Sequence, residues 1–192
     1  MSILLPSKLP IAYPCRLVES FQLSGHSALL RPILPADAAG EKQLFRALSV
    51  ENRRFRYHAA RNELSGGLIE AMTRIDYAKH LGFVITVRKN GQEVLIADCF
   101  YATDDLTKPA EFAVAVSDVW AGQGCGRRLI AALDRGASEF GIPALYGDVM
   151  FDNIRMLGLL SSLEFDPQPV DGNGALRMQR RVHHQAQCRD KP

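Results

Sequence analysis

Residues 111–128 read EFAVAVSDVWAGQGCGRR and place a strand, a glycine-rich turn and the start of a helix directly after one another. After Glu111 the run 112–116 is apolar on both faces, as expected for a strand that is covered on both sides of a sheet. Backbone N–H groups at the start of a helix have no partner within that helix, and glycines let an anion approach them closely. The stretch therefore predicts a site for a nucleotide-like diphosphate at the end of a central strand.

Hydrophobic periodicity on either side of this stretch predicts alternating strands and helices. Asn90-Gly91, between two apolar runs, predicts a hairpin because both residues tolerate positive φ. Gly141 and Pro143 mark the end of the helix that begins near Cys125. The expected strands are 16–22, 27–31, 81–88, 94–101, 111–116, 142–150 and 174–182, and the expected helices are 36–48, a piece after 49, 65–73, 125–140 and 153–163. This order predicts an α/β protein with a mixed sheet and one crossover unit at its centre.

Length and composition indicate one globular domain. The 192 residues are 47% hydrophobic and 23% charged, which excludes a disordered chain. We expect an extended N-terminal arm over 1–15, the domain over 16–183 and a C-terminal tail over 184–192. The formal net charge of only +2 argues against a dedicated nucleic-acid binder, because such a protein needs an excess of basic side chains to neutralise phosphates.

Cysteine spacing and apolar runs bear on metals and on cellular location. The four cysteines lie far apart, and none pairs with a cysteine or histidine at zinc spacing, so no metal site is expected. His183-His184 is read as part of an exposed tail. The sequence has no signal-peptide h-region and no run of about 20 apolar residues. We therefore expect a cytoplasmic protein with no membrane partner.

Two common phosphate-binding motifs do not match the glycine-rich turn. A P-loop ends in a lysine followed by a hydroxyl residue, and the turn has neither at those positions. A dinucleotide fingerprint that starts at Gly122 puts Arg127 where the third glycine belongs. One that starts at Gly124 puts Leu129 there. Another kind of diphosphate site is required.

The turn resembles motif A of the GNAT family of N-acetyltransferases, which cradles the pyrophosphate of coenzyme A. That motif has Gln or Arg, two further residues, Gly, one residue, and then Gly or Ala. Gly124 and Gly126 match its glycine positions, and Ala121 stands where the family usually has Gln or Arg. Residues 153–165 are similar to a later segment of the family, with Glu164 in place of the usual glycine.

Upstream segments resemble the acetyltransferase domain of bacterial Pat-type protein-lysine acetyltransferases. These segments are 30–32, 48–51, 56–57 and 75–77. Such domains are often fused to a large acyl-CoA-synthetase-like domain, for which 192 residues leave no room. The resemblance implies a GNAT fold, with a central, mostly antiparallel mixed sheet flanked by helices, and acetyl-CoA as co-substrate. The residues it implies for binding acetyl-CoA are Val114, Ala115, Val116, Gly122, Gln123, Gly124, Cys125, Gly126, Arg127, Arg128, Asn153 and Met156.

Acetyl transfer to an amine needs a base, because a lysine amine with a pKa of about 10.4 is protonated at pH 7. Glu111, the acid that opens the central strand, is the candidate general base, acting directly or through a water. A glutamate in this position resembles the base of Pat-type domains; the alternative is a glutamate in solvent at the strand edge. Backbone amides over 114–116 are candidates to polarise the thioester carbonyl.

A general acid is harder to find in the sequence. Leu160 occupies the position where many family members carry a tyrosine as general acid, and leucine cannot donate a proton. Tyr146 and Cys125 are the remaining candidates, with core packing as the alternative for both. The thiolate can also leave unassisted and take its proton from water.

The acceptor is expected to be a lysine of a protein. The helical insertion carries four arginines, which form either a solvated helix face or a contact for an acidic acceptor. These are Arg53, Arg54, Arg56 and Arg61. The Pat resemblance suggests an acyl-CoA synthetase as the partner. A small amine as acceptor and a non-catalytic acetyl-CoA sensor are the alternatives, and the sequence is compatible with a monomer or a homodimer.

Overall fold

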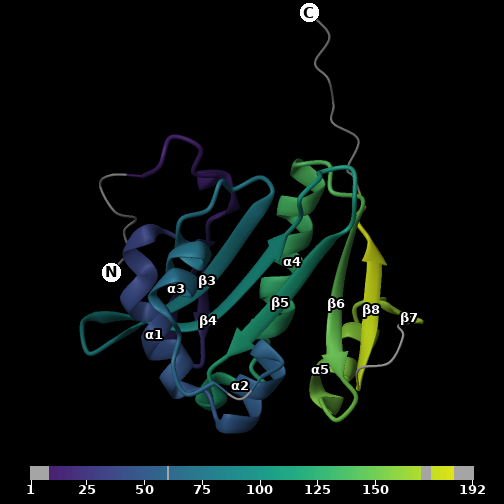
Figure 1. Cartoon of the computed structure of the whole chain (residues 1–192). Helices are drawn as coiled ribbons and strands as arrows, with labels where there is room; N and C mark the ends of the chain where they lie inside the picture. Colours follow the sequence, from purple (N-terminus) through teal and green to yellow (C-terminus); the bar gives the residue numbers. More distant parts are fainter. Residues whose placement is uncertain (1–8, 60, 170–173, 184–192) are drawn as a thin grey trace, which may run out of the picture.

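The computed structural model describes residues 9–59, 61–169 and 174–183. The strands are β1 Glu19–Leu23, β2 His26–Pro32, β3 His80–Lys89, β4 Gln92–Ala102, β5 Ala110–Val116, β6 Ala144–Met150, β7 Asp166–Gln168 and β8 Ala175–Arg181. They form one eight-stranded sheet in the order β1-β2-β3-β4-β5-β6-β8-β7 (Figure 1). Neighbouring strands are antiparallel except β5 and β6, which are parallel. The α/β class and the mixed, mostly antiparallel sheet are confirmed.

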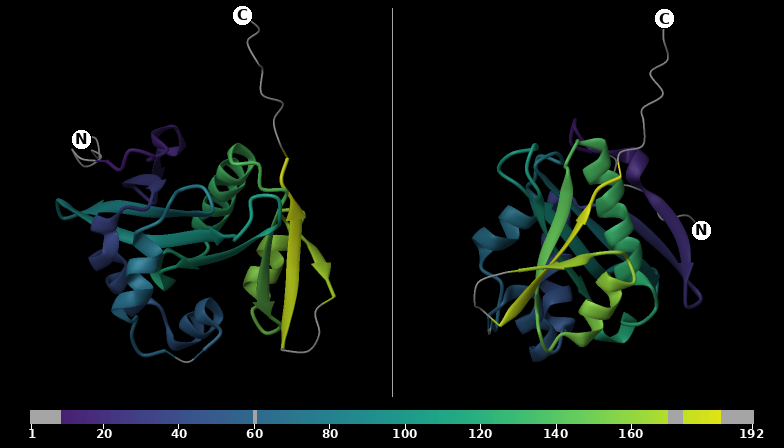
Figure 2. Two further views of the ribbon diagram at one scale, coloured as in Figure 1. Left: turned by 45° about the horizontal axis from the view of Figure 1, so that its top comes forward. Right: turned by 90° about the vertical axis from the view of Figure 1, so that its right-hand side faces the viewer.

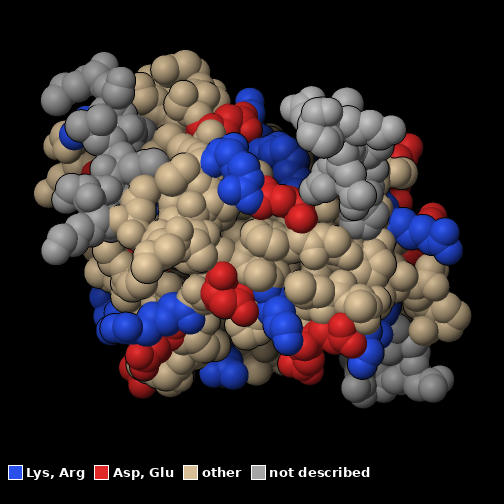
Figure 3. Space-filling model, turned by 90° about the horizontal axis from the view of Figure 1, so that it is seen from above, with Lys and Arg blue, Asp and Glu red and all other residues tan. Residues whose placement is uncertain are grey.

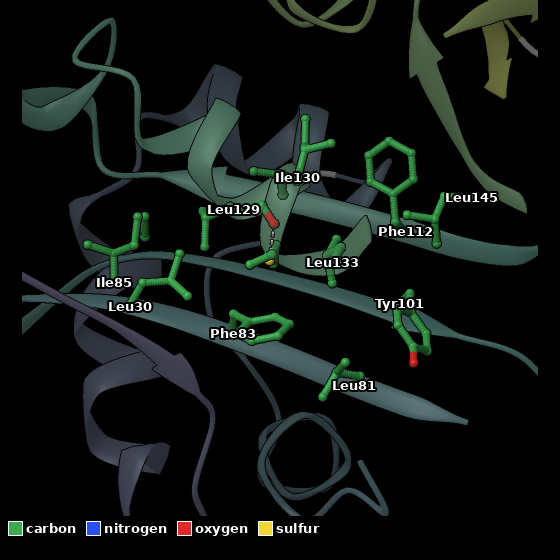
Figure 4. Packing of buried hydrophobic residues seen from close by; sticks show 14 of the residues in the cluster. Leu30, Leu81, Phe83, Ile85, Tyr101, Phe112, Leu129, Ile130, Leu133 and Leu145 are labelled. Carbon is green, nitrogen blue, oxygen red and sulfur yellow. Dashed lines mark hydrogen bonds between the residues drawn. The ribbon is translucent and has the colours of Figure 1, made fainter. Parts of the chain in front are cut away.

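Helices cover both faces of this sheet (Figure 2). They are α1 Ala38–Ala47, α2 Val50–Tyr57, α3 Gly66–Thr73, α4 Cys125–Glu139 and α5 Ile154–Ser161. The larger core lies between α4 and the sheet, where Leu129 and Leu133 pack on residues such as Leu30, Phe83 and Ile85 (Figure 4). Fully burying one such side chain stabilises the fold by about 1.5–3 kcal/mol. A smaller cluster joins α1 to the opposite face.

Glycines fix both ends of α4. Gly124, at the N-cap, has φ +86°, a left-handed conformation in which a side chain is strained. At the other end Gly141 has φ +76°, and the Ile142 N–H donates to the carbonyl of Ala137 at 2.9 Å. The expected bounds of this helix, including its stop at Gly141, agree with the structure.

The sheet divides along its parallel pair. β5 and β6 are in register only at Ala110 with Leu145 and at Glu111 with Tyr146, after which the strands diverge (Figure 1). The start of the divide is tightly packed: a Cβ added to Gly147 would lie 3.0 Å from the Phe112 ring. A split therefore opens from Phe112 onward, toward the N-terminus of α4.

Several elements differ from expectation. Residues 15–17 form a 3-10 turn, so the first strand begins later than predicted. The short edge strand β7 lies between two predicted elements and was not predicted. A register shift at Ile85/Thr86 adds a bulge between β3 and β4. The C-terminal end of the predicted N-terminal arm contacts the sheet, where the Tyr13 hydroxyl donates to the Pro32 carbonyl of β2 at 2.9 Å. The expectations for 1–8 and 184–192 lie outside the described residues.

Charge on the surface is mixed. On the face seen in Figure 3, the basic and acidic side chains of the described residues lie in small, interspersed groups. Such a surface produces no strong field of one sign, in keeping with the net charge of +2. Within the described ranges, no helix combines the length and apolar character needed to cross a bilayer.

Candidate active site

The split between β5 and β6 holds a cavity of about 300 Å³, here called the slot. Its described lining is Leu48, Asn52, Val114, Ala115, Val116, Trp120, Ala121, Gly122, Gly124, Cys125, Gly126, Arg127, Asn153, Arg155, Met156 and Leu159. Most of the residues expected to bind acetyl-CoA are brought together here. Gln123 and Arg128 are the two that do not line the slot.

The edge of β5 presents unpaired backbone groups to the slot. The N–H of Ser117 donates to the carbonyl of Ile96 at 2.9 Å, which fixes which residues of β5 bond to β4. Because pairing alternates along an antiparallel ladder, Ala115 faces β4, whereas the backbone groups of Val114 and Val116 point toward β6. β6 has already diverged there. These N–H and C=O groups can therefore bind a ligand that carries amides.

The N-terminus of α4 forms one wall of the slot. Gly122 and Gly124 have φ of +77° and +86°, and a Cβ at either would meet no protein atom within 4 Å. A Cβ at Gly126 would lie 3.1 Å from the Leu159 side chain. Open space thus faces the N–H groups of the first helical turn, which with the helix dipole favour an anion. This arrangement is compatible with the predicted diphosphate site.

Side chains on the outer side of the turn hold it in place. The Gln123 amide donates to the Val119 carbonyl at 3.0 Å and accepts from Ser24. The Arg128 guanidinium pairs with Glu19 at 2.6 Å and lies over the Phe21 ring at 4.2 Å. Both side chains thus tie the turn to the β1–β2 hairpin, so only their backbone groups remain for a ligand.

Helix α2 spans the two sides of the split. On the β5 side, the Asp118 carboxylate accepts from the Ser49 N–H at 3.0 Å and from the Asn52 side chain. On the β6 side, Arg54 donates to Asp152 at 2.5 Å. The helical insertion thus forms part of the lining of the slot through Asn52, a role that its sequence did not indicate.

Glu111 lies where two further cavities meet. A cavity of about 600 Å³, here called the cleft, lies against α3, the end of β4 and the start of β5. A third, of about 380 Å³, shares Glu111 and Ala113 with the cleft and shares Val114 and Met156 with the slot. The exposed Glu111 side chain therefore stands between the slot and the cleft.

The four arginines of the insertion do not form one surface. Arg53 donates to the carbonyls of Phe45 and Leu48, both at 3.0 Å, and so caps the end of α1. Arg54 bonds to Asp152, and Arg56 turns inward to the buried Asp98 at 3.6 Å. Arg61 is exposed. The expectation of a shared basic contact for an acidic acceptor is therefore not supported.

The candidates for general acid lie in different places. Leu160 is fully buried in the core and does not line the slot. Tyr146 lines the cleft beside Glu111 and not the slot. It is therefore on the side from which the amine of the acceptor is expected to approach. Cys125 lines the slot, and burial raises the pKa of its thiol. Of these three, only Cys125 is on the side where a thiolate would leave.

A buried acid pair lies under α2 and was not predicted. Asp98 on β4 and Glu41 on α1 are each 1% exposed, with Arg56 beside Asp98. Burial, followed by the charge of Asp98, raises the pKa of Glu41 well above its usual range. Burial also raises the pKa of Asp98, while Arg56 opposes that change. We assign the proton to Glu41 and the negative charge to Asp98. An aspartate inside an apolar strand was the available sequence signal.

A sheet divided along its one parallel pair, beside a glycine-rich helix start, defines the acyl-CoA N-acyltransferase class of fold. The solved GNAT domain of S. lividans PAT superposes with a TM-score of 0.79 at 23% identity, over 88% of this chain and 99% of that one. The structure of yncA from Salmonella typhimurium, which contains its cofactor acetyl-CoA, gives a TM-score of 0.61 at 19% identity, over 83% and 96%.

Sequence comparison gives the same assignment. An acetyltransferase of Pseudomonas aeruginosa is 29% identical over 148 residues, which are 77% of this chain and 79% of the relative. Acetyltransferase Pat of Mycolicibacterium smegmatis is 29% identical over 141 residues, 73% of this chain but only 41% of the relative. The chain matches no protein-family model. The chain is thus similar in sequence to acetyltransferases and has the fold of the GNAT family. The free backbone groups of β5 and the N-terminus of α4, which both face the slot, are compatible with acetyl-CoA as its ligand.

Proposed function

We propose that the chain transfers the acetyl group of acetyl-CoA to the side-chain amine of a lysine in a protein, with Glu111 as the general base. The observation that carries this proposal is the position of Glu111 between the slot and the cleft. A base placed there is within reach of an amine that enters from the cleft and attacks a thioester held in the slot.

Each part of the slot has a defined role in this scheme. Glu111 accepts the proton of the amine, directly or through one water, so that a neutral nitrogen attacks. The N–H groups of Val114 and Val116 hold the donor and polarise its carbonyl, since they face the gap in the sheet. The N–H groups around Gly124 bind the diphosphate. The departing thiolate takes a proton from water or from Cys125.

The lining of the cleft favours a lysine over a polyamine. The wall formed by α3 and the residues just after it is apolar, with Leu68, Met72 and Ile75, and suits the alkyl stem of a lysine. The charged or ionisable side chains of the lining, tyrosines aside, are Arg56, His80, Asp104, Lys108 and Glu111. Because the two acids do not outnumber the basic residues, a polycation finds no excess of negative charge there. A single amine on an alkyl stem is the better fit.

The test is a CoA-release screen with the purified protein. We expect turnover with lysine-containing proteins, an acyl-CoA synthetase first among them, and little with spermidine or an aminoglycoside. Glu111→Gln should lower kcat about 10²- to 10⁴-fold, while calorimetry shows unchanged acetyl-CoA affinity. Radiolabelled acetyl-CoA should leave a labelled protein band in a lysate.

Two results would replace this proposal. Efficient turnover of a small amine without a labelled protein band would make the chain a small-molecule acetyltransferase. Tight binding of acetyl-CoA without CoA release for any amine would make it a sensor. If Glu111→Gln keeps nearly full kcat across pH, the acetyltransferase activity stands, but Glu111 is not its general base.

A further inference from the structure

Tyr146 lies directly opposite Glu111 at the point where the sheet divides. The two residues are Cα partners in the parallel pair of β5 and β6, so their side chains leave the same face of the sheet. Both side chains line the cleft. Partial burial raises the pKa of the Tyr146 phenol, and the nearby charge of the Glu111 carboxylate adds to that effect. The phenol is therefore protonated and available as a hydrogen-bond donor.

The ring of Tyr146 is held from its other side. The Arg177 guanidinium on β8 lies over the ring, 4.3 Å from its centre. Arg177 is itself fixed by Asp148, which accepts hydrogen bonds from it at 2.7 and 2.8 Å. Asp148 follows Tyr146 by two residues on β6 and pairs with Arg177 across the ladder. A planar guanidinium in a two-point pair is a rigid support for an aromatic ring.

We propose that Tyr146 is a positioning residue for Glu111: its hydroxyl donates to one carboxylate oxygen and leaves the other to accept the proton of the amine. The proposal rests on the proposed function, because it takes Glu111 as the base. Arg177 and Asp148 keep the ring in place. Tyr146 thus has a role on the amine side, and it is not the missing general acid, since it does not line the slot.

The hydrogen bond has a consequence for the pH dependence. A donor to the ionised carboxylate favours that form, so removing the hydroxyl disfavours it. Tyr146→Phe should move the acidic limb of the kcat/KM profile to higher pH by about 0.5–1 unit, which corresponds to the net contribution of one ordinary hydrogen bond. It should also lower kcat about tenfold. A residue with a purely structural role would change the rate without moving the limb.

Other charged groups face the same two side chains, and the test must separate their effects. They are Arg56 and His58 on α2 and just after it, His80 on β3, Asp104 and Lys108 before β5, Asp148 on β6 and Arg177 on β8. The histidines need particular control, because histidine is the side chain that most readily changes charge near neutral pH. His58→Gln and His80→Gln should leave the acidic limb in place.

The deciding measurement does not depend on the acceptor. In protein labelled with ¹³C in its glutamate side chains, the carboxyl signal of Glu111 is assigned by its loss in Glu111→Gln and titrated by NMR. We expect its midpoint to move to higher pH in Tyr146→Phe and to stay in place in Tyr57→Phe, which removes a different hydroxyl from the cleft. Circular dichroism and acetyl-CoA calorimetry establish that both variants are folded and bind the donor.

The outcomes distinguish this proposal from the function on which it rests. An unchanged Glu111 midpoint in folded Tyr146→Phe overturns the positioning role, whatever the turnover. A lower kcat with an unmoved acidic limb also overturns it, because the effect is then structural. If Glu111→Gln keeps nearly full activity while Tyr146→Phe moves the Glu111 midpoint, the hydrogen bond is real and the assignment of the base fails.

Discussion

Replacing Glu41 with glutamine is expected to remove a loss of stability that the protein suffers as the pH rises above about 5. Glu41 and Asp98 are each 1% exposed, and Asp98 faces Arg56 at 3.6 Å. Burial, followed by the charge of Asp98, raises the pKa of Glu41 well above its usual range. The folded protein therefore retains a proton that the unfolded chain has already released.

The size of the effect follows from this difference in bound protons. An unfolded glutamate titrates near pH 4.3. Between that pH and the raised pKa of Glu41, the free energy of unfolding falls by about 1.4 kcal/mol for each pH unit, because the unfolded state binds fewer protons. For a chain of this size each such loss lowers Tm by roughly 3–6 °C. Glutamine does not titrate, so the variant should lack this slope.

The assay is urea unfolding of both proteins at pH 5, 6, 7 and 8. The difference between Glu41→Gln and the parent should grow with pH in favour of the variant, and Glu51→Gln, at an exposed position, should show no such trend. Asp98→Asn should instead be destabilising, by up to about 3 kcal/mol, because it leaves the largely buried Arg56 without its counter-charge. Parallel stability curves for Glu41→Gln and the parent would refute the assignment of the buried proton.

Three further substitutions test the packing of the site. Gly124→Ala should cost about 1–2 kcal/mol through strain at φ +86° and weaken acetyl-CoA binding at least about tenfold by calorimetry, whereas Gly66→Ala should leave that affinity unchanged. Leu160→Tyr should destabilise the core by about 1–3 kcal/mol in urea and give no gain in kcat, so a faster enzyme would contradict the placement of Leu160. Gly147→Ala should push against the Phe112 ring, cost about 1–3 kcal/mol and lower kcat; an unchanged Tm would show that the start of the divide can relax.

Much of the fold could be predicted because its signals are local. Asn90-Gly91 forms the predicted hairpin, and Gly141 ends the long helix, since both positions need a positive φ that few other residues accept. The run 112–116 belongs to a central strand, as its apolar residues on both faces predict. β7 escaped prediction because three residues with a proline carry no periodic signal.

The parts of the candidate site that main-chain groups form could be predicted from the sequence. The parts that side chains form were harder to predict. The glycines of the turn and the strand before it lie along one stretch of sequence, so their arrangement follows from local geometry. Arg53 donates to the carbonyl of Phe45 at the end of another helix, and Arg56 pairs with the carboxylate of Asp98 on a strand. Charge counting along one helix cannot show such pairings, which arise only on packing.

The split in the sheet leaves Glu111 at the end where β5 and β6 are still paired. The two parts of the sheet touch through the pairs at Ala110 and Glu111, and the gap widens toward Val116. Any opening or closing of the gap would therefore be a hinge-like movement about these two pairs. A change in the width of the gap would displace the strands most beside Val116 and least beside Glu111. Glu111, the proposed base, thus lies at the point that such a movement would displace least.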